Sequence, residues 1–230
     1  MSKNLKIGVI VADRDEYIPF VNEVSPYNPQ KYDYYNREAI SFELSGNEII
    51  CLNCGIGKVN AATAAAFLAD KCDMILNYGL SGGISGVRRG EISLPDKYLE
   101  HDFDLTAIGY KPCEKPGQEY IYSADSKLLR LAKELLWGVV GTAVCGDRFV
   151  SNEKDREFLQ NTFGAVSCDM ETAAVASVCS MADIPFMAIR RISDDAGDTA
   201  VESYTDMNKN EGETLGQIFL KYLSFVCEQF

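Results

Sequence analysis

The chain of 230 residues contains a single histidine, His101, and has fewer basic than acidic residues, 22 Lys and Arg against 34 Asp and Glu. Because only one imidazole is present, any mechanism that needs two is excluded, and carboxylates become the main candidates for proton transfer. The formal net charge of -12 is spread along the chain. This acidity disfavours nucleic acid or an anionic membrane as a partner and leaves small molecules and proteins.

Long apolar runs and flexible linkers are also lacking. No segment approaches the roughly 20 apolar residues of a membrane span, and the N-terminal run LKIGVIVA meets acids too soon for a signal peptide. We therefore expect a cytoplasmic protein. No Pro-, Gly- or Ser-rich linker divides the chain, and 47% hydrophobic residues can form a sizeable core, so we predict one domain over residues 1–230.

The eight cysteines raise the question of disulfides or a metal site. Cys51 and Cys54 form a C-x-x-C pair, but the pair lies in the strand-like run EIICLNCG and no second pair exists. His101 is far away in the sequence, so the usual ligand spacing of a zinc site is missing. We predict reduced, mostly buried thiols.

Apolar runs of strand length alternate with helix-like stretches. This pattern predicts an α/β fold with a mostly parallel, buried sheet and helices on its faces. The residues between Asp33 and Cys54 read as consecutive strands, so part of the sheet should be antiparallel. The predicted helices are DRDEYIPFVNEV, KVNAATAAAFLADK, EKDREFLQNTF, ETAAVASVCSMAD and a long C-terminal helix from about Tyr204 to Val226.

Polar and glycine-rich residues follow these predicted strands. Since ligands of α/β sheets collect at the carboxyl ends of strands, we expect acids from three distant segments to meet at one rim, with Arg190 or Arg191 as a partner. The segments are Asp13 to Glu16, Gly55 to Lys58, Gly79 to Gly83, Gly146 to Phe149, Asp169 to Glu171 and Arg190 to Asp195.

Two features of this set have more than one interpretation. CGIGKVN lacks the spacing of G-x-x-x-x-G-K-[ST], so a nucleotide-phosphate site is not predicted, and the glycines either form tight turns or let the backbone approach a flat ligand. Asp169 and Glu171 in CDMETAA are either capping acids of the next helix or functional carboxylates, because an unpartnered buried carboxylate is costly.

An ordered series of motifs covers nearly the whole chain: KIGVIVADRDE, GIGKVNAATAA, NYGLSGG, HDFDLTAIGYKPCEKPGQ, GDRFVS, DMETAA and IRRISDDA. In this order they resemble the bacterial 5′-methylthioadenosine/S-adenosylhomocysteine nucleosidases of the nucleoside phosphorylase superfamily. The resemblance implies a three-layer α/β/α sandwich around a twisted mixed β-sheet, a homodimer, and neither cofactor nor metal. The implied reaction is hydrolysis of the N-glycosidic bond of a 5′-substituted adenosine, which releases adenine.

The resemblance also implies roles for single residues. Cleavage through an oxocarbenium-like sugar needs a protonated leaving group, negative charge near the ribose and a positioned water. Asp194 would be the general acid, which requires a pKa raised by an apolar site. Glu16 would activate the water, and Glu171 would bind the ribose hydroxyls with help from Arg190.

The remaining pocket residues are implied in the same way. Met170 would pack under the sugar, Phe149 would stack on adenine, and the Val150 backbone would read the edge of the base. The apolar channel for the 5′ substituent would receive residues of both subunits. Further substrate-binding residues are Ser81, Gly82, Ser193, Ile56 and Tyr204, with Leu105, Ile108 and Pro116 reaching across the dimer.

The chain departs from the family pattern at several of these positions. Leu80 stands where relatives have the serine expected to orient the catalytic aspartate, and Ser81 should point elsewhere because side chains alternate along a strand. Asp13 and Arg14 replace methionine and glutamate. Arg148 and Arg191 stand where relatives usually have small residues. Ile108 replaces an aromatic residue, and Tyr204 replaces phenylalanine.

Three functions therefore stay open. The first is the nucleosidase, and the second is a related nucleoside hydrolase or phosphorylase with another base or 5′ group. A phosphorylase would need several arginines around phosphate, for which Arg14, Arg88 and Arg89 are candidates. The third is a non-catalytic nucleoside-binding homologue, which Leu80 favours.

Overall fold

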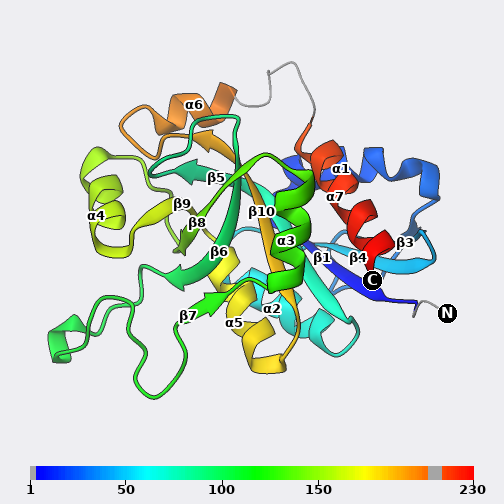
Figure 1. Ribbon diagram of the computed structural model, residues 1–230, viewed down its shortest axis with the longest axis horizontal. Coiled ribbons are helices and arrows are strands. Elements are labelled where there is room, and N and C mark those ends of the chain that lie inside the picture. The colour runs from blue at the N-terminus through cyan, green and yellow to red at the C-terminus, as the bar shows by residue number, and fades with distance from the viewer. Residues whose placement is uncertain (1–3, 207–213) are drawn as a thin grey trace.

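The computed structural model describes residues 4–206 and 214–230. A ten-stranded sheet lies between helices on both of its faces (Figure 1). The strands are β1 (Lys6–Val11), β2 (Gln30–Lys31), β3 (Ala39–Leu44), β4 (Asn47–Asn53), β5 (Met74–Gly83), β6 (Ile92–Glu100), β7 (Ile121–Ser123), β8 (Gly138–Cys145), β9 (Ala165–Asp169) and β10 (Phe186–Asp194). The helices are α1 (Arg14–Glu23), η1 (Ser25–Tyr27), α2 (Lys58–Ala69), η2 (Thr106–Ile108), α3 (Ser126–Leu135), α4 (Glu153–Phe163), α5 (Thr172–Ala182), α6 (Ala200–Asp206) and α7 (Leu215–Gln229).

The sheet is mixed, as predicted. β4, β1, β5 and β10 pair in parallel with one another in that order, and so do β6, β8 and β9. The pairs β10–β6 and β5–β9 are antiparallel, and β3 pairs antiparallel with β4 in the region predicted to do so. β5 pairs with β10 along one edge, and with β1 and then β9 along the other. Because β10 also pairs with β6, the strands β10, β6, β8, β9 and β5 close into a ring. The ends of β5, β9 and β10 therefore meet.

Alternate side chains of each central strand enter two separate cores. In β1, Ile7 and Val9 pack with the helices α1 and α7, whereas Ile10 packs on the opposite face with α2. Gly8 lets α2 approach closely, since a Cβ atom there would lie 2.9 Å from Leu68 Cδ1. This arrangement of helices on both faces confirms the predicted three-layer architecture.

Helix α1 is held against the sheet by an aromatic cluster. Phe20 is fully buried, and its ring centroid lies 5.3 Å from that of Tyr78 on β5 and 5.6 Å from that of Phe219 on α7. Burial of such a side chain contributes about 1.5–3 kcal/mol. The packing fixes the first turn of α1, and with it Glu16, beside the end of β5.

The predicted C-terminal helix from Tyr204 to Val226 is not continuous: Tyr204 to Asp206 belong to α6, and residues 207–213 lie outside the described residues. α6 ends at Asp206, and Thr214 is an extended N-cap whose hydroxyl accepts the Gln217 N–H, so α7 begins at Leu215. β6, β7 and α3 were not predicted from the sequence. Pro95 and two charged residues interrupt the apolar pattern of β6, ISLPDKYLE, which hides the strand.

Two expectations about the chain as a whole can be compared with the structure. All eight cysteines are free and buried, which confirms the predicted reduced thiols. Within residues 4–206 and 214–230, no helix has the length and apolar character needed to cross a membrane.

Candidate active site

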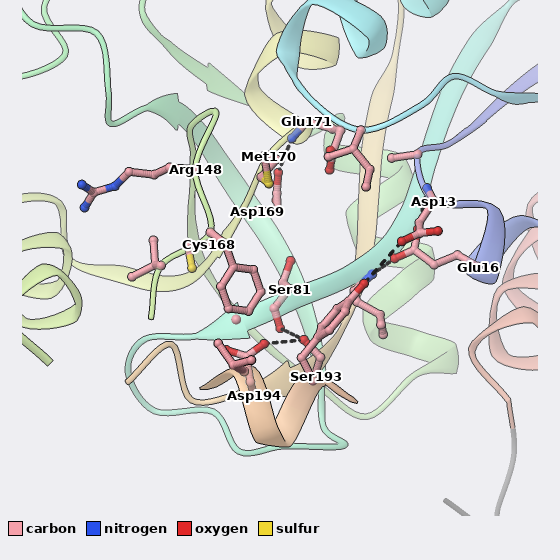
Figure 2. Close-up of a pocket in the computed structure, with 18 residues that line it drawn as sticks. Asp13, Glu16, Ser81, Arg148, Cys168, Asp169, Met170, Glu171, Ser193 and Asp194 are labelled. Carbon is pink, nitrogen blue, oxygen red and sulfur yellow. Dashed lines mark hydrogen bonds between the residues drawn. The ribbon is translucent and has the colours of Figure 1, made fainter. Parts of the chain in front are cut away.

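A cavity of about 390 Å³ opens where β5, β9 and β10 end. Its wall brings together segments that are far apart in the sequence, and Figure 2 shows Asp194 and Glu16 on opposite sides with Met170 and Glu171 on a third. The predicted site residues in this wall are Glu16, Ile56, Ser81, Gly82, Phe149, Val150, Met170, Glu171, Ser193, Asp194 and Tyr204. The wall also contains Ala12, Asp13, Leu80, Arg148, Cys168, Asp169 and Val201.

Four predicted site residues lie outside this wall. Arg190 is buried behind it, in contact with the carboxylates described below. Leu105, Ile108 and Pro116 belong to the segment between β6 and β7, which projects away from the body of the molecule (Figure 1). Ile108 is 70% exposed, and within one chain none of these three residues lines the cavity.

The two acids of CDMETAA have different surroundings. Asp169 caps helix α5: its Oδ1 accepts the N–H groups of Glu171 and Thr172, both at 2.8 Å. Glu171 makes no cap hydrogen bond, and its Oε1 instead accepts the Gly57 N–H at 2.9 Å. The capping interpretation is therefore right for Asp169, while the carboxylate of Glu171 is left on the cavity wall.

Arg190 connects these acids beneath the cavity. Its side chain is 1% exposed, and its Nη2 donates to Asn77 Oδ1 at 2.6 Å. Its guanidinium also lies 3.6 Å from Asp169 Oδ2 and 3.8 Å from Glu171 Oε2. A Cβ atom at Gly79 would collide with Nη1, so glycine is needed there to admit the buried cation.

Glu16 is both a helix-capping and a cavity residue. It lies in the first turn of α1, where its Oε2 accepts the Asp13 N–H at 3.4 Å in a capping box. Its Oε1 accepts the Leu80 N–H at 2.6 Å. Burial raises the pKa of Glu16 to about 8, although the Arg190 charge and the Leu80 N–H act in the opposite direction.

Asp194 and Glu171, two further acids of the wall, also have raised pKa values. Asp194 is 2% exposed, and burial raises its pKa, opposed by hydrogen bonds from Ser193 Oγ at 2.6 Å and Ala196 N at 2.8 Å. Burial likewise raises the pKa of Glu171, opposed by the charge of Arg190. The wall thus has weakly acidic carboxyl groups with one buried cation behind them, an arrangement suited to proton transfer at neutral pH.

An aromatic pair forms another part of the wall. Phe149 is 45% exposed, and its ring meets that of Tyr204 edge-on with centroids 5.7 Å apart. The Tyr204 hydroxyl donates to Asp13 Oδ2 at 3.3 Å, which connects α6 to the start of α1. An aromatic face left open on a cavity wall can stack on a flat ring.

The chain is similar to known proteins over most of its length. The family model described as "Phosphorylase superfamily" matches residues 6–224. The 5′-methylthioadenosine/S-adenosylhomocysteine nucleosidase of Tolumonas auensis is 31% identical over 95% of this chain and 100% of its own, and that of Geobacillus thermodenitrificans is 34% identical over 80% and 82%. This chain belongs to that nucleosidase family. A Helicobacter pylori nucleosidase variant, solved with 5′-methylthioadenosine in the active site, superposes with a TM-score of 0.89 at 25% identity over 98% of this chain and 100% of that one.

In this nucleosidase, Arg148 and Arg14, two basic residues that differ from the family pattern, have partners outside the cavity. Arg148 is the one arginine among the described residues of the wall, and its Nη2 lies 2.6 Å from Asp155 Oδ2. Figure 2 shows its side chain directed away from the acids. Arg14 pairs with Glu38 at 3.0 Å on the surface. Among the described residues, no three His, Cys, Asp or Glu side chains are grouped as a metal site.

Sequence reasoning missed the backbone donors of the nucleosidase site. The Gly57 and Leu80 N–H groups each bind a carboxylate, and Gly57 has a φ of 99°, a conformation that favours glycine. The G-I-G-K motif was a signal for such a turn. Val201 and Cys168 also line the cavity, but apolar residues of this kind carry no sequence signal for a site.

Proposed function

We propose that the protein hydrolyses the N-glycosidic bond of 5′-methylthioadenosine, S-adenosylhomocysteine or a similar 5′-substituted adenosine and releases adenine. The observation that carries the proposal is the separation of two acids, the buried Asp194 and the half-buried Glu16, on opposite sides of one cavity. Glu171 lies on a third side (Figure 2), with the buried Arg190 beside it. Glycosidic cleavage needs an acid at the leaving group and a base at the water on the other side of the sugar.

Asp194 is the general acid in this mechanism. It donates its proton to the imidazole nitrogen of the purine, so that adenine leaves as a neutral base. Burial raises its pKa, which keeps more of the carboxyl group protonated at a given pH. Phe149 stacks on the departing base, and the Val150 backbone reads its edge.

Glu16 and Glu171 act on the sugar. Glu16 in its ionised form holds the attacking water and takes its proton, since it faces the cavity opposite Asp194. Glu171 accepts hydrogen bonds from the ribose hydroxyls and places negative charge near the oxocarbenium-like ring. The Gly57 N–H and the Arg190 guanidinium fix the direction of the Glu171 carboxylate. Met170 packs under the sugar.

Hydrolysis is favoured over phosphorolysis by the positions of the arginines. A phosphate site needs several cationic donors directed at one point. Arg148 is engaged by Asp155, Arg14 by Glu38, and Arg88 and Arg89 lie outside the described wall of the cavity. Water, held by Glu16, is therefore the proposed nucleophile.

The assembly is proposed to be a homodimer. Ile56 and Tyr204 line the cavity and are 53% and 37% exposed within one chain, and the 5′ substituent is proposed to lie against them. Leu105, Ile108 and Pro116 stand on a segment that projects from the body (Figure 1), so they can complete the channel of a second copy. Burial of the tail contributes about 0.8 kcal/mol per methylene.

Product analysis with and without phosphate tests the proposed reaction. We expect 5′-methylthioadenosine to yield adenine and the free thioribose at the same rate in phosphate-free and phosphate-containing buffer. Formation of a sugar 1-phosphate only when phosphate is present would identify a phosphorylase instead. Tight binding of the nucleoside without any free base would identify a non-catalytic homologue.

A further inference from the structure

The residues that hold Asp194 differ from the family pattern. The family serine expected to orient the catalytic aspartate is replaced by Leu80, whose side chain has no hydrogen-bond donor. The structure nevertheless gives both oxygens of Asp194 a donor. Ala196 N lies 2.8 Å from Oδ1, and Ser193 Oγ lies 2.6 Å from Oδ2.

Ser193 has a second acceptor within reach. Its side chain is 1% exposed, and its Oγ lies 3.2 Å from the carbonyl oxygen of Ser81 on β5. A serine hydroxyl has one proton, so it can donate to Asp194 Oδ2 or to the Ser81 carbonyl, but not to both at once. Figure 2 shows Ser193 between Asp194 and Ser81.

We propose that Ser193 is the positioning residue of the general acid and that it replaces the hydroxyl missing at Leu80. The inference rests on the proposed function of Asp194 as proton donor. When Asp194 is ionised, the Ser193 hydroxyl donates to Oδ2. When Asp194 is protonated, the hydroxyl turns to the Ser81 carbonyl, so its donor is satisfied in both states.

This change of acceptor favours the transfer of the Asp194 proton to the base. During cleavage the proton of Asp194 passes to the base nitrogen, the electron pair of the glycosidic bond goes to the base, and a carboxylate remains. The Ser193 proton stays on its own oxygen and changes acceptor only. The hydrogen bond to Oδ2 therefore strengthens as negative charge develops, which stabilises the transition state more than the ground state.

Ser81 offers no substitute for this hydroxyl. Its Oγ is buried and has no hydrogen-bond partner, so it does not contact Asp194. Side chains alternate along β5, and a Cβ atom at Gly82 would lie 3.1 Å from Asp194 Oδ1. Leu80 is two residues earlier and lies on the same side as Gly82, so a serine at position 80 would return a hydroxyl to the side that faces the acid.

The test is Ser193→Ala, with two measurements. Loss of a hydrogen bond to a charged group is expected to lower kcat for 5′-methylthioadenosine about 10- to 100-fold. The pKa of the Asp194 carboxyl, followed by ¹³C NMR and assigned with Asp194→Asn, should rise by about one unit, because the ionised form loses its donor. The alkaline limb of the kcat profile should move upward with it.

Ser167→Ala is the matched control. Ser167 is also fully buried, and its Oγ pairs with Ser93 Oγ at 3.1 Å outside the cavity wall. It should leave the pKa of Asp194 and the alkaline limb unchanged. Leu80→Ser added to Ser193→Ala should recover about tenfold or more of the lost kcat and return the pKa toward the wild-type value.

Two results would overturn the proposal. An unchanged Asp194 pKa in Ser193→Ala would show that the hydroxyl does not hold the acid, whatever the loss of kcat. Failure of Leu80→Ser to return the pKa in the double variant would show that position 80 is not the missing site. If wild type releases no adenine while the NMR pKa still rises in Ser193→Ala, the proposed function fails and the positioning role stands.

Discussion

The carboxyl groups of the cavity wall have different hydrogen-bond and charge partners. Asp194 has only neutral donors, a hydroxyl and a peptide N–H, in its hydrogen bonds. Glu171 and Asp169 lie within 4 Å of the Arg190 guanidinium. A carboxyl group without a cationic partner is easier to keep protonated, whereas one beside a cation is easier to ionise. This contrast supports the proposed roles of Asp194 as the general acid and Glu171 as the charged ribose ligand.

The difference in unfolding free energy between Glu16→Gln and wild type should depend on pH. The pKa of Glu16 is raised from 4.5 to about 8, so the folded state binds this proton more tightly than the unfolded state. Its contribution to stability is complete below the unfolded pKa and is lost as the pH rises through about 8. As the pH rises from 5 to 9, the unfolding free energy of Glu16→Gln should therefore increase relative to that of wild type, by up to about 4 kcal/mol.

Urea unfolding at the two pH values measures this difference. Asp15→Asn provides the control, because it removes the same charge from the same helix turn at an exposed position outside the cavity. Equal pH dependence in Glu16→Gln and wild type would contradict a raised pKa at Glu16.

At the scale of elements, a partly buried ion network joins the projecting segment to the cavity. Lys58, the first residue of α2, contacts Glu100 at the end of β6 at 3.1 Å and Asp102 at 2.6 Å. Lys115 of the projecting segment also pairs with Glu100. Asp102 in turn accepts the Asp147 N–H at 2.9 Å. Lys58 follows Gly57, whose N–H donates to Glu171, so the network adjoins the turn that holds the Glu171 carboxylate.

Lys58→Met should therefore weaken both the fold and the site. It leaves Glu100 and Asp102 with Lys115 as the remaining cation of the network, and breaking such a pair is expected to cost about 2–3 kcal/mol of unfolding free energy. KM for the nucleoside should rise, since the Gly57 turn is less constrained.

Chemical denaturation and steady-state kinetics check the change at Lys58. Lys6→Met is the matched control because Lys6 pairs with Glu48 at 2.8 Å where both side chains are about half exposed. Such a surface pair contributes about 0–1 kcal/mol. If the two variants lose the same stability, the network at Lys58 has no special role.

The elements that the sequence predicts well are those with an unbroken apolar pattern and a clear boundary. KIGVIV, MILNYGLSGG and FMAIRRISD are buried on both faces and were readily assigned to β1, β5 and β10. β6 was missed because Pro95 and charges interrupt it, and the boundary between α6 and α7 was missed because its signal is only the Thr214 cap. The ring closure through β9 and β10 depends on pairing between distant strands, which no local pattern contains.

The site could be predicted in part. Acids after three strands were expected to meet, and the closed ring brings Glu171 and Asp194 to one cavity with Glu16 from α1. The contact of Ser193 with Asp194, on which the proposed positioning role rests, was not predictable, because it is a 2.6 Å contact between neighbouring residues at a bulged strand end. The backbone donors Gly57 and Leu80 were missed for the same reason: every residue has an N–H group, and only the fold directs it.

At the scale of the whole molecule, the proposed dimer gives the projecting segment its function. Ile108 is 70% exposed, and in Ile108→Asp the new charge should enter the channel of the second copy. We expect kcat/KM for 5′-methylthioadenosine to fall about tenfold or the dimer to dissociate. The Tm of the variant should equal that of wild type when both are diluted to monomers. Sedimentation velocity and kinetics distinguish the two effects.

Trp137→Asp is the control for this surface change, since Trp137 is 98% exposed on another segment. It should leave both assembly and kinetics unchanged. A fully active Ile108→Asp that sediments as a monomer would contradict completion of the cavity by a partner subunit.

The role of Asp194 is tested most directly by the adenine released from 5′-methylthioadenosine in phosphate-free buffer by wild type and Asp194→Asn side by side. The amide keeps the size of the side chain but has no acidic proton, so we expect release by wild type and a loss of about 100-fold or more in the variant. The variant should still bind the nucleoside. Release by Asp194→Asn at the wild-type rate would contradict general-acid catalysis by Asp194.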